Sequence, residues 1–477
     1  MDEQMKPFPA TLALAGALML SACAQMDAVK PASQLKTPPA LNAPWAGIPS
    51  ADWWRQWRDP QLEQLIRLAL QDNPGLRGAE ARLRQAQALS EVSAAAAQPQ
   101  INAQWQSTRQ LHAEKNLVPP AGHGNYDWQT RAAVNLSYDL DAWGRERQAM
   151  SASLSDAQMA AADARLSALN LETAVIRAYL QLSEQYQQKD LAVAALQQQQ
   201  ALLDLSLRRK AAGLTAQPEV EQQRGKLPAA RAQLEQIDER IATLGNQLAA
   251  LSGQTPDTQN RPRRPTLRLD QPLDPLAAVP AQLLGRRPDL SAQRWRVEAE
   301  AARIKVARAA FYPNINISAF VGYQAIGFAD LLSPAAALRG FAPAISLPIF
   351  EGGRLRGQLR AQTAAYDQAV ESYNAVLINA LSETASAIVR ARSADQQSRQ
   401  ADQALDAASR ERALAEQAYR AGLNDQSAVR QLRLSELSAR QKRAQAQAQR
   451  LDSYAALMAA LGGGIEPQTP IADGEVK

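Results

Sequence analysis

The residue types that most often perform chemistry are scarce in this chain. Cysteine occurs once, at Cys23, and the two histidines, His112 and His123, fall within one predicted loop. A single cysteine cannot close an internal disulfide and leaves no second thiol for a redox pair or a metal cage. A Ser-His-Asp or Cys-His catalytic arrangement is hard to assemble from these residues. We therefore expect no enzymatic activity, no metal site and no cofactor.

The surroundings of Cys23 predict a different chemistry, the attachment of lipid. The apolar run Ala10–Leu20 is too short to span a bilayer but suits the central region of a signal peptide. The run ends at Leu20-Ser21-Ala22-Cys23, which resembles the lipobox of bacterial lipoproteins. This resemblance implies that residues 1–22 are removed and that the Cys23 thiol carries a diacylglycerol. A plain signal peptide with an incidental cysteine is the alternative.

The mature chain contains one unit twice. A Pro- and Ala-rich stretch at 23–50 predicts a flexible tether, and two copies follow at 51–253 and 280–464. A Pro- and Arg-rich linker at 254–279 separates the copies, and residues 465–477 form a tail. Five turn or breaker signals recur in the same order, which indicates a duplication. The paired signals, roughly 210 residues apart, are Asn73-Pro74-Gly75-Leu76 with Arg287-Pro288-Asp289-Leu290, Gln98-Pro99-Gln100-Ile101 with Tyr312-Pro313-Asn314-Ile315, Trp143-Gly144-Arg145 with Gly352-Gly353-Arg354, Ala212-Gly213-Leu214 with Ala421-Gly422-Leu423, and Ala250-Leu251-Ser252-Gly253 with Ala460-Leu461-Gly462-Gly463.

Helix and strand patterns alternate within each copy. A helix is predicted from Pro74 to about Ala97, and Pro99 stops it because proline lacks an N–H and clashes with the preceding turn. Runs with a period of two follow in both copies. In the first copy, one run begins at Ile101 and a second lies near Tyr126–Leu140. In the second copy, the runs lie at residues 314–324 and 338–350. Strands of this length can cross a bilayer as part of a tilted barrel.

Aromatic residues concentrate in and beside these runs and nearly vanish from the predicted long helices. Aromatic rings gather at membrane–water interfaces, where the ring lies in apolar surroundings and its polar edge stays wet. We therefore favour membrane strands with an aromatic girdle over a soluble sheet with one wet face. The girdle residues are Trp105, Tyr126, Trp128, Tyr138, Trp143, Phe311, Tyr312, Phe320, Tyr323, Phe341 and Phe350.

Long helices follow the strands. No proline or glycine occurs between Gly144 and Gly213, which predicts one helix on the order of 100 Å long. The second copy matches it from Arg354 to Ala421. Its apolar residues have the spacing of a coiled coil, and the ordinary two-helix coiled coil is the alternative to a wall of helices packed side by side. This stripe comprises Leu355, Leu359, Tyr366, Val370, Tyr373, Leu377, Leu381 and Ile388.

Each long helix ends at Ala-Gly-Leu, where glycine can adopt the left-handed conformation that closes a helix. Return helices are predicted over Pro218–Leu251 and Asp425–Leu461. Gly225 and Pro228 predict a kink or break in the first return helix, whereas the second has no such residues.

Four strands cannot close a transmembrane barrel, and open sheet edges are not tolerated in lipid. We therefore expect oligomerisation. Three copies would supply about twelve strands and a ring of about twelve helices, which together enclose a wet passage.

The complete pattern resembles the TolC-like outer-membrane factor family, specifically its lipoprotein branch of the NodT type. The resemblance rests on the lipobox, the duplicated unit, Phe311-Tyr312-Pro313-Asn314-Ile315 and Phe350-Glu351-Gly352-Gly353-Arg354, and it covers essentially the whole mature chain. It implies a homotrimer with a twelve-stranded outer-membrane β-barrel, continuous with a periplasmic α-helical barrel. It also implies a conduit for drugs and toxic compounds, docked to a periplasmic adaptor and an inner-membrane pump.

The resemblance also assigns the helical turns. Gly213-Leu214-Thr215 and Gly422-Leu423-Asn424 match the tips at which adaptors dock. Relatives commonly ring the closed aperture with acidic residues just after the second glycine. This chain has Ala428 and Gln431 at those places, flanked by Arg430 and Arg433, with Asp425 as the nearest acid. A neutral or basic ring predicts weaker block by cations, although both arginines could instead face neighbouring helices.

Other classes of protein fit less well. The net charge of +5 comes from 52 basic and 47 acidic residues that are interspersed along the helices, so nucleic-acid binding is not expected. A periplasmic coiled-coil adaptor lipoprotein would have one hairpin and additional small β-domains. A lipid-anchored enzyme would need a convergent polar pocket, and the sequence contains no such cluster.

Overall fold

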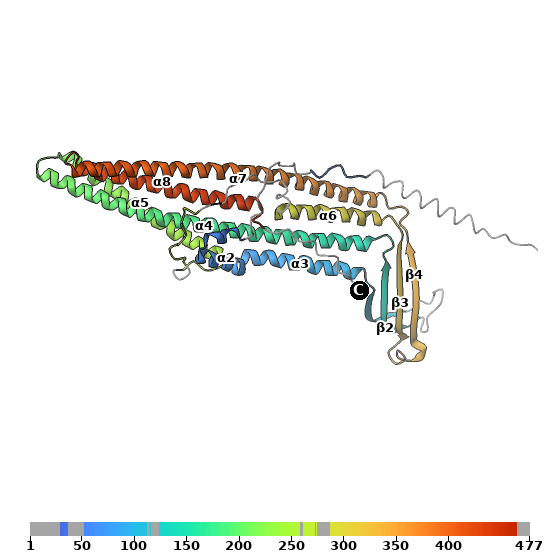
Figure 1. The fold of residues 1–477 in the computed structure, drawn as a ribbon. Helices are drawn as coiled ribbons and strands as arrows, with labels where there is room; N and C mark the ends of the chain where they lie inside the picture. The colour runs from blue at the N-terminus through green and yellow to red at the C-terminus, as the bar shows by residue number, and fades with distance from the viewer. Residues whose placement is uncertain are drawn as a thin grey trace, which may run out of the picture. The chain divides into compact units, whose positions relative to one another are not determined.

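A computed structural model of the protein describes residues 29–36, 52–111, 115, 124–257, 261–271, 273 and 287–464. The signal peptide, Cys23, both histidines and the tail at 465–477 lie outside these residues. The elements in chain order (Figure 1) are η1 (Trp53–Trp57), α2 (Pro60–Asp72), α3 (Pro74–Ala96), β1 (Gln100–Leu111), β2 (Tyr126–Leu140), α4 (Arg145–Ala211), α5 (Gln217–Leu251), α6 (Pro288–Ala309), β3 (Asn314–Ile326), η3 (Pro334–Ala336), β4 (Ala337–Ser346), α7 (Arg354–Arg420) and α8 (Gln426–Ala460).

The duplication is visible in the lengths of the elements. Helices α4 and α7 have 67 residues each, α5 and α8 have 35 residues each, and α3 and α6 have 23 and 22. The predicted mainly helical fold with long uninterrupted helices is therefore confirmed. None of the described helices is long and apolar enough to cross a membrane.

The chain divides into two compact units, and each unit contains parts of both copies. The strand unit comprises Met1–Lys36, Arg82–Ala160 and Ala292–Asn374. The helical unit comprises Thr37–Ala81, Ala161–Ser291 and Ala375–Lys477.

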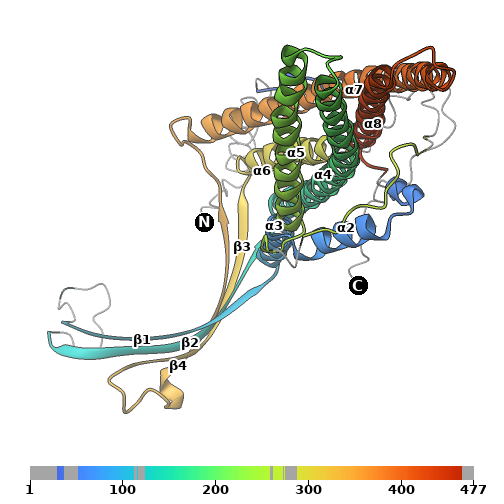
Figure 2. The same ribbon diagram turned by 90° about the vertical axis from the view of Figure 1, so that its left-hand side faces the viewer.

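The strand unit contains one curved antiparallel sheet in the order β1-β2-β3-β4 (Figure 2). Each copy contributes one hairpin, and the pairing of β2 with β3 joins them, with Val134 opposite Val321. Strands β1 to β3 lie where the period of two predicts them. Strand β4 ends at Ser346 instead of Phe350, because Pro348 has no N–H to continue a ladder.

The N-terminal residues 29–36 are not a free tether but pack within the strand unit. The backbone N–H groups of Ala32 and Ser33 both donate to Asp367 Oδ1 at 3.0 Å. Further along, Asn374 accepts from the Lys36 N–H at 2.9 Å. Val29 is buried against Leu359 and its neighbours on α6 and α7. This fixed segment differs from the flexible tether that composition predicts for 23–50.

The core of the helical unit joins both copies around a tryptophan cluster. Trp53 makes edge-on contacts with Trp57 and Tyr454, at ring-centroid distances of 5.3 and 5.6 Å. Asp59 caps α2 by accepting from the N–H groups of its first turn, and it also accepts from the Tyr179 hydroxyl at 2.9 Å. Residues of η1, α2, α4, α5 and α8 therefore share one apolar core.

Of the kink or break predicted for the first return helix, the break is wrong, because α5 is continuous through Pro228. An interior proline costs about 3 kcal/mol through its missing hydrogen bond and its clash with the preceding turn. Burial of Val220 and Leu227 before the proline and of Ile237 after it, and the bond from Gln199 to Gln223 at 3.0 Å, oppose this cost. Tertiary packing therefore holds the helix together. On α7, all eight residues of the predicted coiled-coil stripe are buried or half-buried.

Candidate functional site

The two turns of the helical unit, between α4 and α5 and between α7 and α8, have the same geometry. Gly213 and Gly422 have φ angles of +72° and +73°, the left-handed conformation that closes a helix. In each turn the following leucine N–H bonds back five residues, from Leu214 to Arg209 and from Leu423 to Ala418, both at 2.8 Å. A Cβ at either glycine would meet no atom within 4 Å, so the backbone conformation alone requires glycine.

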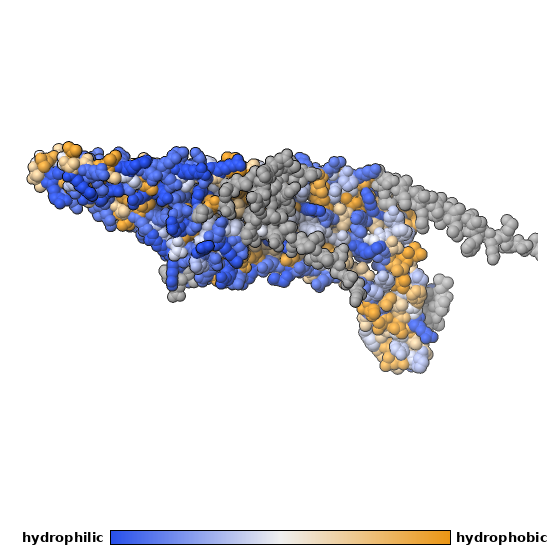
Figure 3. All heavy atoms as spheres, in the orientation of Figure 1, coloured by the Kyte–Doolittle hydropathy of each residue, from blue (hydrophilic) through white to orange (hydrophobic). Residues whose placement is uncertain are grey.

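Each turn presents an apolar side chain to solvent. Leu214 is 70% exposed and Leu423 is 83% exposed. Tyr419 is also exposed beside the second turn. Figure 3 shows apolar residues gathered at this end of the helices, against a largely hydrophilic helical surface. Exposed apolar residues that cluster in this way are typical of a protein–protein contact.

The polar residues of the turns are engaged within the chain. Asp425 caps α8 by accepting from the Ser427 N–H at 2.6 Å, and its carboxylate pairs with the Arg209 guanidinium of the other copy. The Ser427 N–H first, and Arg209 in addition, hold the pKa of Asp425 below its ordinary value. Thr215 accepts from Arg209 at 3.3 Å, and Asn424 accepts from the Asp425 N–H at 2.9 Å. One ion pair thus joins the turns of the two copies.

The predicted aperture residues lie on the first turns of α8. Ala428 is half-buried and Gln431 is exposed. Arg430 donates to Gln198 on α4 at 3.3 Å. Arg433 pairs with Glu416 on α7 at 2.9 Å. Both arginines therefore have partners on neighbouring helices of the same chain.

The sheet has one apolar and one polar face. Residues paired in register share a face, and successive residues alternate between faces. Ile101, Val134 and Val321 fall on the apolar face, and Gln104, Asn135 and Gln324 fall on the polar face. Figure 3 shows the apolar colour over the strands. Membrane strands alternate in this way, with the polar side facing the lumen.

Most of the predicted girdle residues lie on the apolar face or beside the sheet. Those on the apolar face are Trp105, Tyr126, Trp128, Tyr138, Tyr323 and Phe341. Those that flank the strands are Trp143, Phe311, Tyr312 and Phe350. Phe320 differs, because its register with Asn135 and Gly340 places it on the polar face. The girdle prediction rested on where aromatic residues concentrate and did not consider which face of the strand each one occupies.

On the polar face, Phe320 contacts a residue that sequence reasoning missed. The guanidinium carbon of Arg131 lies 5.5 Å from the Phe320 ring centroid. Arg131 stands in the polar phase of the 126–140 run, between Gln106 and Gln324 in the register. That phase was the only signal in the sequence that could have identified it.

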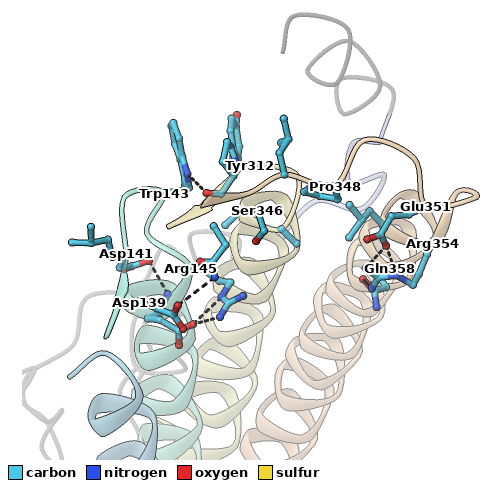
Figure 4. A pocket seen from close by; sticks show the side chains of 18 residues that line it. Asp139, Asp141, Trp143, Arg145, Tyr312, Ser346, Pro348, Glu351, Arg354 and Gln358 are labelled. Atoms are coloured by element: carbon cyan, nitrogen blue, oxygen red, sulfur yellow. Dashed lines mark hydrogen bonds and ion pairs between the residues drawn. The ribbon is translucent and has the colours of Figure 1, made fainter. Parts of the chain in front are cut away.

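The junction between strands and helices holds a cavity of about 450 Å³ (Figure 4). The Trp143 indole stacks on Tyr312 at 4.8 Å and donates to the Pro313 carbonyl at 2.7 Å. Burial raises the pKa of Asp141, but hydrogen bonds from the N–H groups of Arg147 and Glu146 outweigh it and leave the pKa below its ordinary value. These contacts give the junction a structural role.

One titratable group in the helical unit was not foreseen. Burial first, and the nearby Asp52 carboxylate second, raise the pKa of Glu172 to about 7. Among the described residues, no three His, Cys, Asp or Glu side chains are grouped to hold a metal ion.

The model of the outer membrane efflux protein family matches residues 65–254 and 279–463. The chain belongs to this family. It is 42% identical over 362 residues to the fusaric acid resistance protein FusA of Burkholderia cepacia, covering 74% of this chain and 68% of FusA. It is 30% identical over 468 residues to the multidrug resistance outer membrane protein MdtP of Escherichia coli K12, covering 96% and 95% of the two chains.

A solved structure supports the same assignment. The outer membrane protein VceC of Vibrio cholerae has a TM-score of 0.79 and 33% sequence identity, over 88% of this chain and 100% of VceC. The protein is therefore an outer-membrane channel of the TolC-like type that serves efflux. This assignment removes the adaptor alternative.

Proposed function

We propose that three copies of this chain form a closed channel, which passes small organic molecules from a periplasmic adaptor and inner-membrane pump to the exterior. The observation that carries the proposal is the four-stranded sheet, which has an apolar face, a polar face and two open edges. In the described chain β1 pairs only with β2, and β4 pairs only with β3. Open edges are not tolerated in lipid, so β4 of one chain pairs with β1 of the next chain in the trimer.

Cysteines placed on both edges test this closure. Within one chain, β1 and β4 are about 14 Å apart at roughly 4.8 Å per strand, too far for a disulfide. We expect double variants such as Gln104→Cys with Ala342→Cys, scanned along β1 to match the register, to give a covalent species of three chains under oxidation. Ladders that continue beyond three chains, or no cross-linking at any register, would contradict the closed trimer.

The proposed docking site for the adaptor is the pair of helical turns. Exposed Leu214 and Leu423, each held by a left-handed glycine, present matching apolar contacts. We expect Leu214→Asp with Leu423→Asp to abolish co-purification of the adaptor while the oligomeric mass stays unchanged. Retained co-purification would exclude these leucines.

The proposed anchor is a lipid on Cys23. Val29 is fixed near the start of α7, and the intervening residues span at most about 20 Å when fully extended. The lipid therefore lies within about 20 Å of Val29, near the segment that connects β4 to α7. Mass spectrometry of the mature N-terminal peptide tests this, and an unmodified Cys23 would contradict it.

The proposed cargo follows from the relatives. FusA is named for resistance to fusaric acid, MdtP for multidrug resistance, and OpmQ of Pseudomonas putida for pyoverdine export. We expect deletion of this chain to sensitise its host to drugs or toxic organic compounds, with resistance restored by the wild-type chain. Unchanged susceptibility across such compounds would contradict a role in drug efflux.

A further inference from the structure

The polar face of the sheet carries one isolated positive charge at mid-strand. The only charged residues on this face of the described strands are Asp127, Arg131 and Asp139, all on β2. At about 3.3 Å per residue, Asp127 is roughly 13 Å from Arg131 along the strand and Asp139 roughly 26 Å. These separations exceed the Debye length of about 8 Å at physiological ionic strength. Neither carboxylate therefore compensates Arg131 effectively.

The Arg131 guanidinium is held in place without being neutralised. It lies over the Phe320 ring, and no described residue forms an ion pair with it or accepts a hydrogen bond from its buried Nε. Its in-register neighbours are the uncharged Gln106 and Gln324. Between Arg131 and Phe320 on this face stand Ala133 and Gly322, whose small size leaves room for the arginine side chain.

The position of Phe320 is fixed from its other side. Gly340 is its partner in the register on β4, and a Cβ at Gly340 would lie 2.4 Å from the Phe320 ring. Only glycine therefore accommodates this ring without a shift. The ring supplies a surface for the guanidinium through a cation–π contact, which leaves the outward N–H donors available.

We propose that Arg131, supported by Phe320 and Gly340, is an anion-binding site on the lumen face of the barrel, with carboxylate-bearing solutes as its ligands. The guanidinium fork matches a carboxylate in a bidentate geometry. The inference rests on the trimeric channel proposed above, in which three such groups lie at one height. At that height the wall carries positive charge alone, because both carboxylates lie farther away than a Debye length, and such a ring raises the local concentration of anions.

A reporter cysteine opposite Arg131 tests the local potential directly. In the full-length protein, Gln106→Cys is treated with anionic, cationic and neutral methanethiosulfonates, and the protein without the reporter provides the blank. We expect the ratio of anionic to cationic reaction rates to fall roughly three- to tenfold when Arg131→Gln is added. Arg131→Lys keeps the charge and preserves the ratio.

Arg339→Gln is the matched control, because it removes the same charge from the opposite face of the sheet, where it leaves the ratio unchanged. If Arg131→Gln keeps its oligomeric mass and leaves the ratio of anionic to cationic reaction rates unaltered, the proposed anion-binding site is wrong. A reporter that reacts with none of the reagents, the neutral one included, would instead contradict the wet lumen of the proposed channel.

Discussion

The two copies build hairpins of equal length from different contacts. In the second hairpin, Glu436 is buried between α7 and α8 and pairs with Arg412 at 2.6 Å and Arg440 at 2.8 Å. In the first hairpin, α4 and α5 share a buried polar contact that is neutral, the pair Gln199–Gln223. Helix α5 also contains Pro228, whereas α8 contains no proline. The repeat therefore preserves length and turn geometry while the contacts between helices diverge.

The largest expected effect comes from giving the second hairpin the proline of the first. Leu437 lies fifteen residues after Gly422, as Pro228 lies fifteen after Gly213 (437 − 422 = 228 − 213). We expect Leu437→Pro to lower the free energy of unfolding by at least about 3 kcal/mol, because no flanking contacts have adapted to it. Urea titration of the helical circular dichroism signal in detergent measures this, with Leu437→Ala as control. Equal stability of the two variants would show that the repeats tolerate the break alike.

The buried Glu436 carboxylate of the second hairpin, with its two arginine partners, should contribute more than the amide pair of the first. Glu436→Ala removes the buried carboxylate that pairs with Arg412 and Arg440. Arg412 keeps its pair with Glu416 and Arg440 is half exposed, so we expect a loss of about 2 kcal/mol. Gln223→Ala removes a neutral bond, with an expected loss of about 1 kcal/mol. The same urea titration compares the two variants. Similar losses would refute the ranking of the two hairpins.

The first long helix carries a half-buried acid where the second carries leucine. Glu172 and Leu381 both lie 27 residues after the first residue of their helices (172 − 145 = 381 − 354). The pKa of Glu172 is raised from 4.5 to about 7. The unfolded carboxyl therefore releases its proton first as pH rises, and stability falls between pH 4.5 and about 7.

We expect Glu172→Leu to remove that decline and to increase the free energy of unfolding above pH 7 by on the order of 2 kcal/mol. Melting temperatures across this pH range check the prediction, and Glu184→Leu on the same helix gives a comparison. A pH profile that is identical with and without Glu172 would exclude the linkage.

The smallest expected effect is the reverse proline exchange. Pro228→Ala restores a backbone hydrogen bond in α5, but the helix is already held by packing at Leu227. We expect a gain of about 1 kcal/mol, well below the intrinsic penalty for proline. A gain as large as the loss in Leu437→Pro would show that α5 is strained in the native state.

Local signals in the sequence were sufficient to predict most of the helices, strands and turns. Alternation over Tyr126–Leu140 predicts β2 with its observed bounds, and the Ala-Gly-Leu signals predict both left-handed turns. The continuity of α5 could not be predicted, because contacts from distant helices override the local penalty of Pro228. Likewise, no local signal predicts that residues 29–36 pack on α7.

The contacts of the candidate site residues could not be predicted, because they depend on how distant strands and helices pair. The phase of a strand places Arg131 on the polar face, but its contact with Phe320 depends on the register between β2 and β3. That register joins the two copies across a long stretch of chain, which sequence periodicity cannot specify. In the same way, Arg433 and Glu416 meet only because α7 and α8 form a hairpin.

The proposed channel depends most directly on assembly of the chains into a closed ring. The deciding measurement is the native mass of the protein extracted in detergent from isolated outer membranes, determined with correction for bound detergent. We expect three times the mass of the mature chain, with the covalent lipid included. A monomer, or protein released from the membranes without detergent, would contradict it.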